Sequence, residues 1–255
     1  MTGSILRTAL VTGSAKRLGR AIAEDLSRHG FAIAVHANHS IDEAEAFAAS
    51  IRNEGGRAVA LQADLRDGQA TASLMARANA ALGPVDLLVN SASAFIEDSA
   101  ETFEAETFDR HFDLHVRAPA ILSAELLRQL PADSNGLIVN IIDQRVLNPS
   151  PRFFSYGLSK ATLHAATYTM AQAFAPRVRV NGIGPGPTLR SARQTEADFQ
   201  AQIDALPMER GPELREFGQT IRFLFDTPSI TGQMIALDGG QHLAWRAPGA
   251  MEINE

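Results

Sequence analysis

Short apolar runs alternate with longer amphipathic stretches along the whole 255-residue chain. The short runs lie at 9–12, 32–36, 58–62, 87–90, 137–142, 179–183 and 233–237, and they have the length of buried strands. The longer stretches lie at 17–29, 41–53, 69–81, 108–129, 155–174 and 212–225, and they have the length of helices. This alternation predicts an α/β, doubly wound (Rossmann) fold in which helices cover both faces of one seven-stranded parallel sheet.

No internal repeat, low-complexity tract or linker interrupts the pattern, so we expect residues 1–255 to form a single domain. The least regular stretch is 184–211, which is rich in proline, glycine and polar residues. It follows the sixth predicted strand, at the edge where a doubly wound sheet binds its ligands. We therefore expect it to act as a substrate lid.

Composition narrows the class of protein. Apolar residues make up 45% of the chain and charged residues 20%, which are ordinary values for a globular domain. The formal net charge of −6 argues against nucleic-acid and anionic-membrane partners, and no apolar run is long enough to span a bilayer. The chain has no cysteine, and residues 1–7 show no signal-peptide pattern. We expect a cytoplasmic enzyme that acts on a small molecule.

Lysine and tyrosine are both rare, and one of each falls in a single motif. Lys16 and Lys160 are the only lysines among 23 cationic residues, and Tyr156 lies four residues before Lys160 in a predicted helix, on the same face. An ammonium about 4 Å from a phenolate stabilises that ionised form by on the order of 4 kcal/mol at an effective dielectric of 20. Lys160 is thus expected to lower the pKa of Tyr156. The alternative is that both side chains extend to solvent.

A carboxylate, Asp143, ends the fifth predicted strand, 13 residues before Tyr156. Such a group can orient a proton donor or supply the proton itself, although it could also simply face water. We predict that Asp143, Tyr156 and Lys160 are catalytic.

Two histidines, His111 and His115, are also four residues apart. The residues between them lack the glutamate of the zinc-binding H-E-x-x-H motif, and the sequence shows no third ligand. We therefore expect no metal site.

A glycine-containing loop follows the first predicted strand and reads Thr12-Gly13-Ser14-Ala15-Lys16-Arg17-Leu18-Gly19. Glycines in such a loop let backbone N–H groups and a helix N-terminus approach a pyrophosphate. Arg17 occupies the middle position of the usual Gly-x-x-x-Gly-x-Gly pattern. The glycines could instead serve only a turn and a helix cap, but their place directly after an apolar strand favours dinucleotide binding.

The second predicted strand ends in His36-Ala37-Asn38-His39-Ser40, without an acidic residue. NAD enzymes usually place an Asp or Glu about 20 residues beyond the glycines, where it binds the ribose 2′-hydroxyl. Its absence removes a repulsion against a 2′-phosphate, to which Arg17, Asn38, His39 and Ser40 can donate. We therefore predict NADPH/NADP+ as the cofactor. Ser40 can also cap the next helix, and Asp64 can either accept from the adenine amino group or cap a helix.

In the order of these motifs the chain resembles the short-chain dehydrogenase/reductases over nearly its whole length. The resemblance extends to Asn181, to Pro185-Gly186-Pro187-Thr188 and to Asp238-Gly239-Gly240. With this resemblance, the predicted cofactor-binding set is Gly13, Lys16, Arg17, Leu18, Gly19, Asn38, His39, Ser40, Asp64, Leu65, Asn90, Ser91, Ala92, Tyr156, Lys160, Pro185, Gly186 and Thr188.

At three positions the chain departs from the usual family pattern and is similar to the pteridine reductases. Asp143 replaces the usual serine, Arg17 replaces a glycine, and Phe95 follows the small residues 91–94. In that group the phenylalanine stacks the pterin against the nicotinamide and the arginine contacts a cofactor phosphate. The implied substrate-binding set is Arg17, Ser93, Phe95, Asp143 and Tyr156. Phe95 could instead be ordinary core. His115 stands where the family usually has a proton-relay asparagine.

The expected function is NADPH-dependent reduction of a pteridine, dihydromonapterin or dihydrofolate in kind, to the tetrahydro form by hydride transfer to a C=N bond. One alternative is a short-chain carbonyl or 3-oxoacyl reductase, and another is a non-catalytic NADPH-binding sensor or scaffold. Arg190 and Arg193, in the predicted lid, could meet a folate carboxylate or be surface residues. The resemblance also implies a homotetramer, with residues 241–255 at interfaces.

Overall fold

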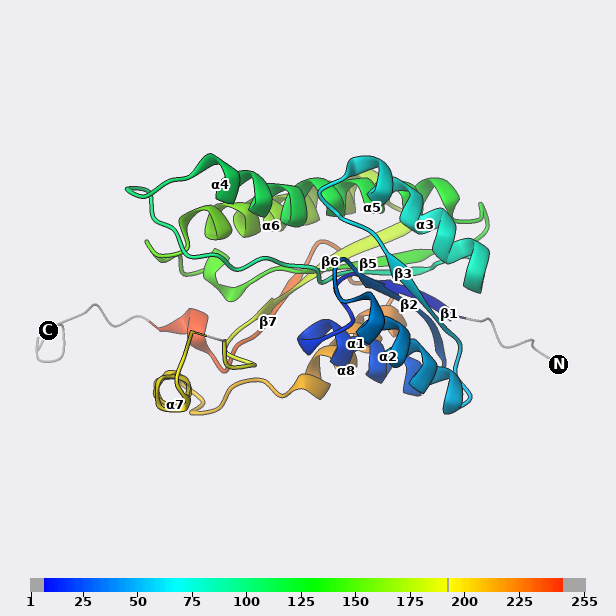
Figure 1. The fold of residues 1–255 in the computed structure, drawn as a ribbon. Coiled ribbons are helices and arrows are strands. Elements are labelled where there is room, and N and C mark those ends of the chain that lie inside the picture. Colours follow the sequence, from blue (N-terminus) through cyan, green and yellow to red (C-terminus); the bar gives the residue numbers. More distant parts are fainter. Residues whose placement is uncertain (1–6, 192, 245–255) are drawn as a thin grey trace, which may run out of the picture.

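The computed structural model describes residues 7–191 and 193–244, and it confirms the predicted fold class. One parallel sheet lies between two layers of helices (Figure 1). Its strands are β1 (Arg7–Val11), β2 (Phe31–Ala37), β3 (Ala58–Gln62), β4 (Leu87–Asn90), β5 (Gly136–Ile141), β6 (Val178–Pro185) and β7 (Met234–Leu237). They are ordered β3-β2-β1-β4-β5-β6-β7, so the direction of winding reverses between β1 and β4. A doubly wound sheet binds its ligands at such a reversal.

Each face of the sheet is covered by its own group of helices (Figure 1). One layer contains α1 (Arg17–Arg28), α2 (Ile41–Asn53) and α8 (Leu214–Asp226). The other contains α3 (Gly68–Leu82), α4 (Ala105–Phe112), α5 (Ala118–Gln129) and α6 (Phe154–Phe174). Within the described residues, no helix combines the length and the hydropathy that crossing a bilayer requires.

Alternation along the strands divides the apolar residues between two cores. Leu10, Leu88 and Ile138 pack toward α3 and α5, whereas Val11 and Val89 pack toward α1 and α8. Both groups are fully buried. Side chains alternate between the two faces of a strand, so a strand covered on both sides is apolar at most positions. This explains why the sequence shows continuous apolar runs.

Two expected elements differ in the structure. The stretch 108–129, expected to be one helix, consists of the end of α4, a π-helical segment at Asp113–Arg117, and α5. The irregular stretch 184–211 contains a further helix, α7 (Glu196–Asp204), which begins with a capping box between Thr195 and Asp198. None of the residues of α7 is buried, so no apolar stripe marks it in the sequence.

Two predictions that depend on these segments stay predictions. They are the substrate lid at 184–211 and the homotetramer with residues 241–255 at its interfaces. Of the latter stretch, residues 245–255 lie outside the described residues.

Close packing of α1 against α8 requires a glycine. A Cβ added at Gly218 would lie 2.4 Å from Cβ of Asp25, whose carboxylate accepts a 2.8 Å hydrogen bond from Nε of Arg222. We expect Gly218→Ala to lower the free energy of unfolding by about 1–3 kcal/mol, because the two helices must separate. Urea denaturation measures this change.

The matched control is Gly157→Ala in α6, where an added Cβ would meet no atom within 4 Å. It is expected to leave stability unchanged or to raise it by up to about 1 kcal/mol through helix propensity. Equal effects of the two substitutions would contradict the packing argument.

Candidate active site

A cavity of about 1060 Å³ lies at the carboxyl ends of the strands. Its lining comes from segments that follow all seven strands, so the winding reversal between β1 and β4 opens into it. Most of the predicted site residues border it: Gly13, Lys16, Arg17, Leu18, Gly19, Asn38, His39, Leu65, Ser91, Ala92, Ser93, Phe95, Asp143, Tyr156, Lys160, Pro185, Gly186 and Thr188.

The loop after β1 needs its glycines for space. A Cβ on Gly13 would lie 2.8 Å from Cα of Ala92, and one on Gly19 would lie 2.4 Å from the carbonyl oxygen of Gly13. Gly13 also has φ 64°. Arg17 has φ 52°, a left-handed conformation that favours glycine and costs a non-glycine residue on the order of 1 kcal/mol. Thus the arginine keeps the backbone shape of the glycine that usually stands at this position.

Three predicted cofactor residues do not line the cavity. Asn90 is buried and donates through Nδ2 to Oδ1 of Asn140 at 2.8 Å, so it joins neighbouring strands. Asp64 is exposed and accepts from the backbone N–H of Arg66 at 2.9 Å. Ser40 precedes α2, but its side chain makes no capping hydrogen bond. The sequence placed all three near strand ends correctly but could not determine where their side chains point.

His36 is a lining residue to which the sequence analysis assigned no role. Its Nδ1 accepts from the backbone N–H of Gly13 at 3.0 Å, so Nε2 carries the proton and donates to the carbonyl oxygen of Ala63 at 3.1 Å. Burial lowers the pKa of His36 to about 4, which keeps the ring neutral. The imidazole therefore ties the glycine loop to the segment after β3.

The three predicted catalytic residues meet in the cavity wall. Tyr156 Oη donates to Oδ2 of Asp143 at 2.8 Å, while Oδ1 of Asp143 accepts from the backbone N–H of Arg145, also at 2.8 Å. Lys160 Nζ donates to the carbonyl oxygen of Ile141 at 2.8 Å and lies 5.7 Å from the centre of the Tyr156 ring. Tyr156 and Lys160 are both buried.

The prediction that Lys160 lowers the pKa of Tyr156 is wrong in this structure. The pKa of Tyr156 is raised well above its usual value, first by burial and then by the charge and hydrogen bond of Asp143, with Arg145 opposing. Burial lowers the pKa of Lys160 to about 8, and Asp143 opposes that change. The carboxylate, not the ammonium, is the charged group in direct contact with the phenol. Tyr156 is therefore a protonated donor.

Aromatic rings continue the wall beyond Tyr156. Phe95 stacks on Phe153 with ring centres 4.1 Å apart and an angle of 10° between the planes, and it meets Tyr156 nearly edge-on at 4.7 Å. The Phe95 side chain is 37% exposed, so it is not ordinary core. Phe153, for which the sequence predicted no role, adopts φ 59° directly before α6.

Comparison with known proteins identifies the family. The family model described as short chain dehydrogenase matches residues 7–201. The chain belongs to the short-chain dehydrogenase family. A short-chain type dehydrogenase/reductase of Picea abies is 29% identical over 92% of this chain and 92% of the relative. The 3-oxoacyl-(acyl-carrier-protein) reductase FabG of Staphylococcus epidermidis is 26% identical over 93% of this chain and 99% of the relative.

Two solved structures of this family share about half of the sequence. FolM alternative dihydrofolate reductase 1 from Brucella canis, complexed with NADP, is 52% identical with a TM-score of 0.94, over 96% of this chain and 97% of the other. The Brucella suis protein of the same name, also in complex with NADP, is 53% identical with a TM-score of 0.93, over 95% and 97%. The predicted resemblance to pteridine reductase-like short-chain dehydrogenases is confirmed.

His115, in the place of the family's usual relay asparagine, lies in the π-helical segment Asp113–Arg117. π-Helical turns often mark functional sites. Its Nε2 accepts from the backbone N–H of Ala94 at 3.2 Å, so Nδ1 carries the proton and donates to Oγ of Ser159 at 2.8 Å. Ser159 in turn donates to the carbonyl oxygen of Tyr156 at 2.7 Å. The pKa of His115 lies well below its usual value, mainly because the ring is buried.

His111 repeats this arrangement one helical turn earlier. Its Nε2 accepts from the backbone N–H of Ile96 at 3.3 Å, and its Nδ1 donates to Oγ of Ser155 at 2.7 Å. The two imidazoles thus bind the backbone on both sides of Phe95 and join it to α6. We call this arrangement the histidine clamp. It gives both histidines a structural role in this short-chain dehydrogenase.

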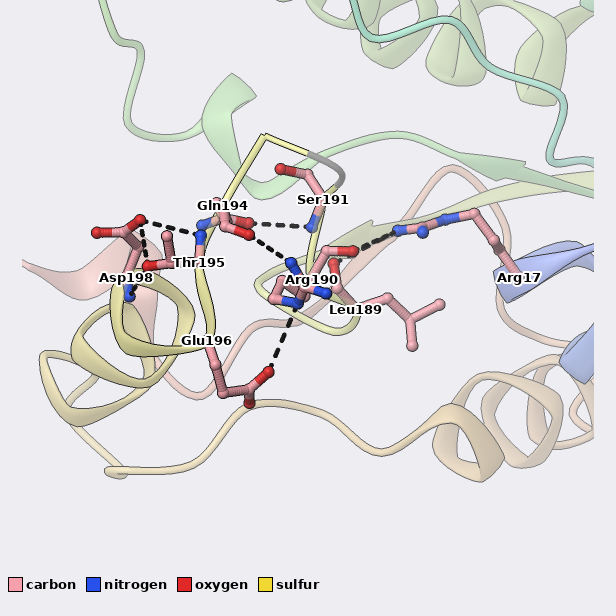
Figure 2. Close-up of polar contacts among 8 residues, drawn as sticks. All are labelled: Arg17, Leu189, Arg190, Ser191, Gln194, Thr195, Glu196 and Asp198. Atoms are coloured by element: carbon pink, nitrogen blue, oxygen red, sulfur yellow. Dashed lines mark hydrogen bonds and ion pairs between the residues drawn. The ribbon is translucent and has the colours of Figure 1, made fainter.

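The segment after β6 contacts the glycine loop through Arg17 (Figure 2). Arg17 Nη2 donates to the carbonyl oxygens of Leu189 at 3.5 Å and of Arg190 at 3.2 Å. Arg190 donates through Nη1 to the carbonyl oxygen of Gln194, and its Nε lies 3.5 Å from a carboxylate oxygen of Glu196. The residue that replaces the usual family glycine therefore links the start of the expected lid to the dinucleotide loop.

Burial of neutral His36 makes stability depend on pH. Above about pH 6.5 the ring is neutral in both the folded and the unfolded chain. Between 6.5 and the folded pKa of about 4, only the unfolded chain takes up the proton, so each pH unit of acidification costs about 1.4 kcal/mol. In urea denaturation at pH 7 and pH 5, His36→Gln should show a smaller loss of stability than the wild type.

Asp86→Asn is the control, because its expected effect on the pH dependence of stability has the opposite sign. Burial raises the pKa of Asp86 to about 6, so the folded chain gains stability as pH falls from about 6 toward the ordinary aspartate pKa of 3.8. Without that gain, the variant should lose stability more steeply than the wild type on acidification. The assignment fails if His36→Gln and the wild type lose stability equally.

Proposed function

We propose that this protein is an NADPH-dependent reductase that converts a pteridine, dihydromonapterin or dihydrofolate in kind, to its tetrahydro form. The observation that carries the proposal is the partly buried 2.8 Å hydrogen bond from Tyr156 to Asp143, at the position where the family usually has serine. Similarity to the two Brucella alternative dihydrofolate reductases supports the substrate class.

The residues present fit a phosphorylated dinucleotide. Gly13 and Gly19 place no side chain at the two closest approaches of the loop after β1, and Lys16, Asn38 and His39 border the cavity. Among the described residues that line the cavity, none that follows β2 is acidic before Glu97. A 2′-phosphate would meet hydrogen-bond donors there and the ammonium of Lys16, which in this structure is paired with the carboxylate of Glu43. Bound NADPH would supply the hydride that adds to carbon.

The protein's own contribution is the proton. Reduction of a C=N bond adds a hydride to carbon and a proton to nitrogen, which leaves a CH–NH group. Tyr156 holds a proton at Oη at neutral pH, because burial and Asp143 raise its pKa. Asp143 accepts the hydrogen bond of the Tyr156 hydroxyl and thereby fixes the orientation of the phenol at the cavity wall. The proton therefore comes from the Tyr156–Asp143 pair.

Lys160 orients the site. Its ammonium uses one of three donors on the carbonyl oxygen of Ile141, which leaves two for ribose hydroxyls. Its positive charge is also held in a buried position near Tyr156. We propose in addition that residues 184–211 act as a lid whose position depends on the contacts of Arg17 with Leu189 and Arg190.

Replacing the carboxylate separates this proposal from a carbonyl reductase. Asp143→Ser restores the residue that the family usually has, but it removes the partner of Tyr156. We expect turnover of dihydromonapterin and dihydrofolate to fall at least 100-fold, as loss of a general acid does. NADPH oxidation is followed at 340 nm with dihydropterins and with a panel of ketones and 3-oxoacyl esters. A variant that reduces ketones better than the wild type, with a wild type inactive on dihydropterins, would establish the carbonyl reductase instead.

Removing the phenolic hydroxyl tests catalysis against mere binding. Tyr156→Phe keeps the ring and its packing but loses the proton donor. We expect kcat to fall at least 100-fold while the Kd for NADPH, measured by calorimetry, stays within about 3-fold. A non-catalytic sensor or scaffold would bind NADPH equally well in both proteins, and neither would oxidise it with any substrate.

A further inference from the structure

Two arginines lie beside the aromatic pair at the end of the cavity that continues beyond Tyr156. The guanidinium carbon of Arg145 is 5.2 Å from the ring centre of Phe95 and 5.0 Å from that of Phe153. The corresponding distances for Arg193 are 5.0 Å and 5.1 Å. Two cations from distant parts of the chain thus converge on one pair of rings.

Both cations lie at the edge of the ring pair. Phe95 and Phe153 are nearly parallel, and a group over the outer face of one ring would be much farther from the other. Since each guanidinium carbon is almost equidistant from the two ring centres, neither covers an outer face. A flat group packed against Phe95 could therefore have both guanidinium groups beside it.

Arg145 is incompletely paired within the described part of the chain. Its Nη1 is buried and has no hydrogen-bond partner there. Leaving a buried donor of a charged group unsatisfied is unfavourable, and a carboxylate or phosphate is its strongest partner. The lining residue Arg152 differs, because its Nη2 lies 2.5 Å from a carboxylate oxygen of Glu97.

Arg193 provides a second donor from the expected lid. Its Nη1 donates to the carbonyl oxygen of Phe95 at 3.1 Å, so it is held against the same ring. Among the described residues, neither Arg193 nor Arg145 has a carboxylate oxygen within ion-pair distance.

We propose that Arg145 and Arg193 form an anion subsite that binds a carboxylate or phosphate on the side chain of the pteridine substrate. The inference rests on the proposed function, which places the reacting C=N bond at Tyr156 and Asp143. The ring centres of Phe95 and Tyr156 are 4.7 Å apart, and the guanidinium carbons of Arg145 and Arg193 lie 5.2 Å and 5.0 Å from the ring centre of Phe95. A substituent that extends from the reacting ring past Phe95 reaches them.

The subsite predicts a preference among substrates with the same ring. Dihydrofolate ends in carboxylates, the phosphate ester of dihydromonapterin ends in a phosphate, and dihydromonapterin itself is neutral at its side chain. The quantity to measure is the ratio of kcat/KM for each anionic substrate to kcat/KM for dihydromonapterin. Calorimetric Kd values for dihydrofolate and dihydromonapterin provide a second readout without turnover.

Arg145→Met keeps much of the stem and removes the charge. We expect it to lower the ratio for at least one anionic substrate 10-fold or more and to weaken dihydrofolate binding more than dihydromonapterin binding, because charge-assisted hydrogen bonds are lost. The substrate whose ratio falls identifies carboxylate or phosphate as the ligand. Arg193→Met should act in the same direction and serves if Arg145→Met does not fold, as judged by circular dichroism.

Arg7→Met is the matched control. Arg7 also lies beside two phenylalanine rings, at 5.6 Å from Phe31 and 4.9 Å from Phe225, but it begins β1 and does not line the cavity. Its ratios should equal those of the wild type.

Two outcomes would overturn the subsite. Ratios that stay at the wild-type value in Arg145→Met and Arg193→Met refute it while leaving the reductase proposal intact. A wild type that turns over no dihydropterin refutes the reductase proposal, and the subsite with it.

Discussion

The site depends on one partly buried contact, the hydrogen bond from the Tyr156 hydroxyl to the Asp143 carboxylate. Asp143 follows β5 and Tyr156 belongs to the first turn of α6, so the sheet and a helix of one layer must keep their relative position for this bond to form. A carboxylate beside a buried phenol raises the cost of removing the phenol's proton, whereas a nearby ammonium would lower it. The phenol therefore keeps its proton in this structure, and the carboxylate accepts its hydrogen bond.

Neutral imidazoles hold the backbone around this pair. His36 fixes the glycine loop, and the histidine clamp fixes both sides of Phe95 against α6. In each case one ring nitrogen accepts from a backbone N–H while the other donates, which only the neutral ring can do. Burial maintains that state by lowering the pKa of all three rings. The dinucleotide loop and the aromatic wall are therefore positioned by the same type of contact.

Much of the fold followed from sequence patterns, because strands buried on both faces are apolar at most positions. The sequence also predicted that Asp143, Tyr156 and Lys160 lie close together, as they do in the structure. No residue of α7 is buried, and the π-helical segment leaves the helical pattern almost unchanged, so neither was predicted. Side-chain direction was the other limit. The sequence did not predict that the Asn90 side chain bonds within the sheet, or that the carboxylate, not Lys160, is the partner of the phenol.

The left-handed backbone of Arg17 has a consequence for how this chain can change. Glycine would relax the turn, yet it would remove the guanidinium that reaches the carbonyl oxygens of Leu189 and Arg190. The backbone conformation at position 17 thus favours glycine, whereas the contacts with Leu189 and Arg190 require arginine. Such a conflict is characteristic of residues that proteins retain for their work at the expense of thermodynamic robustness.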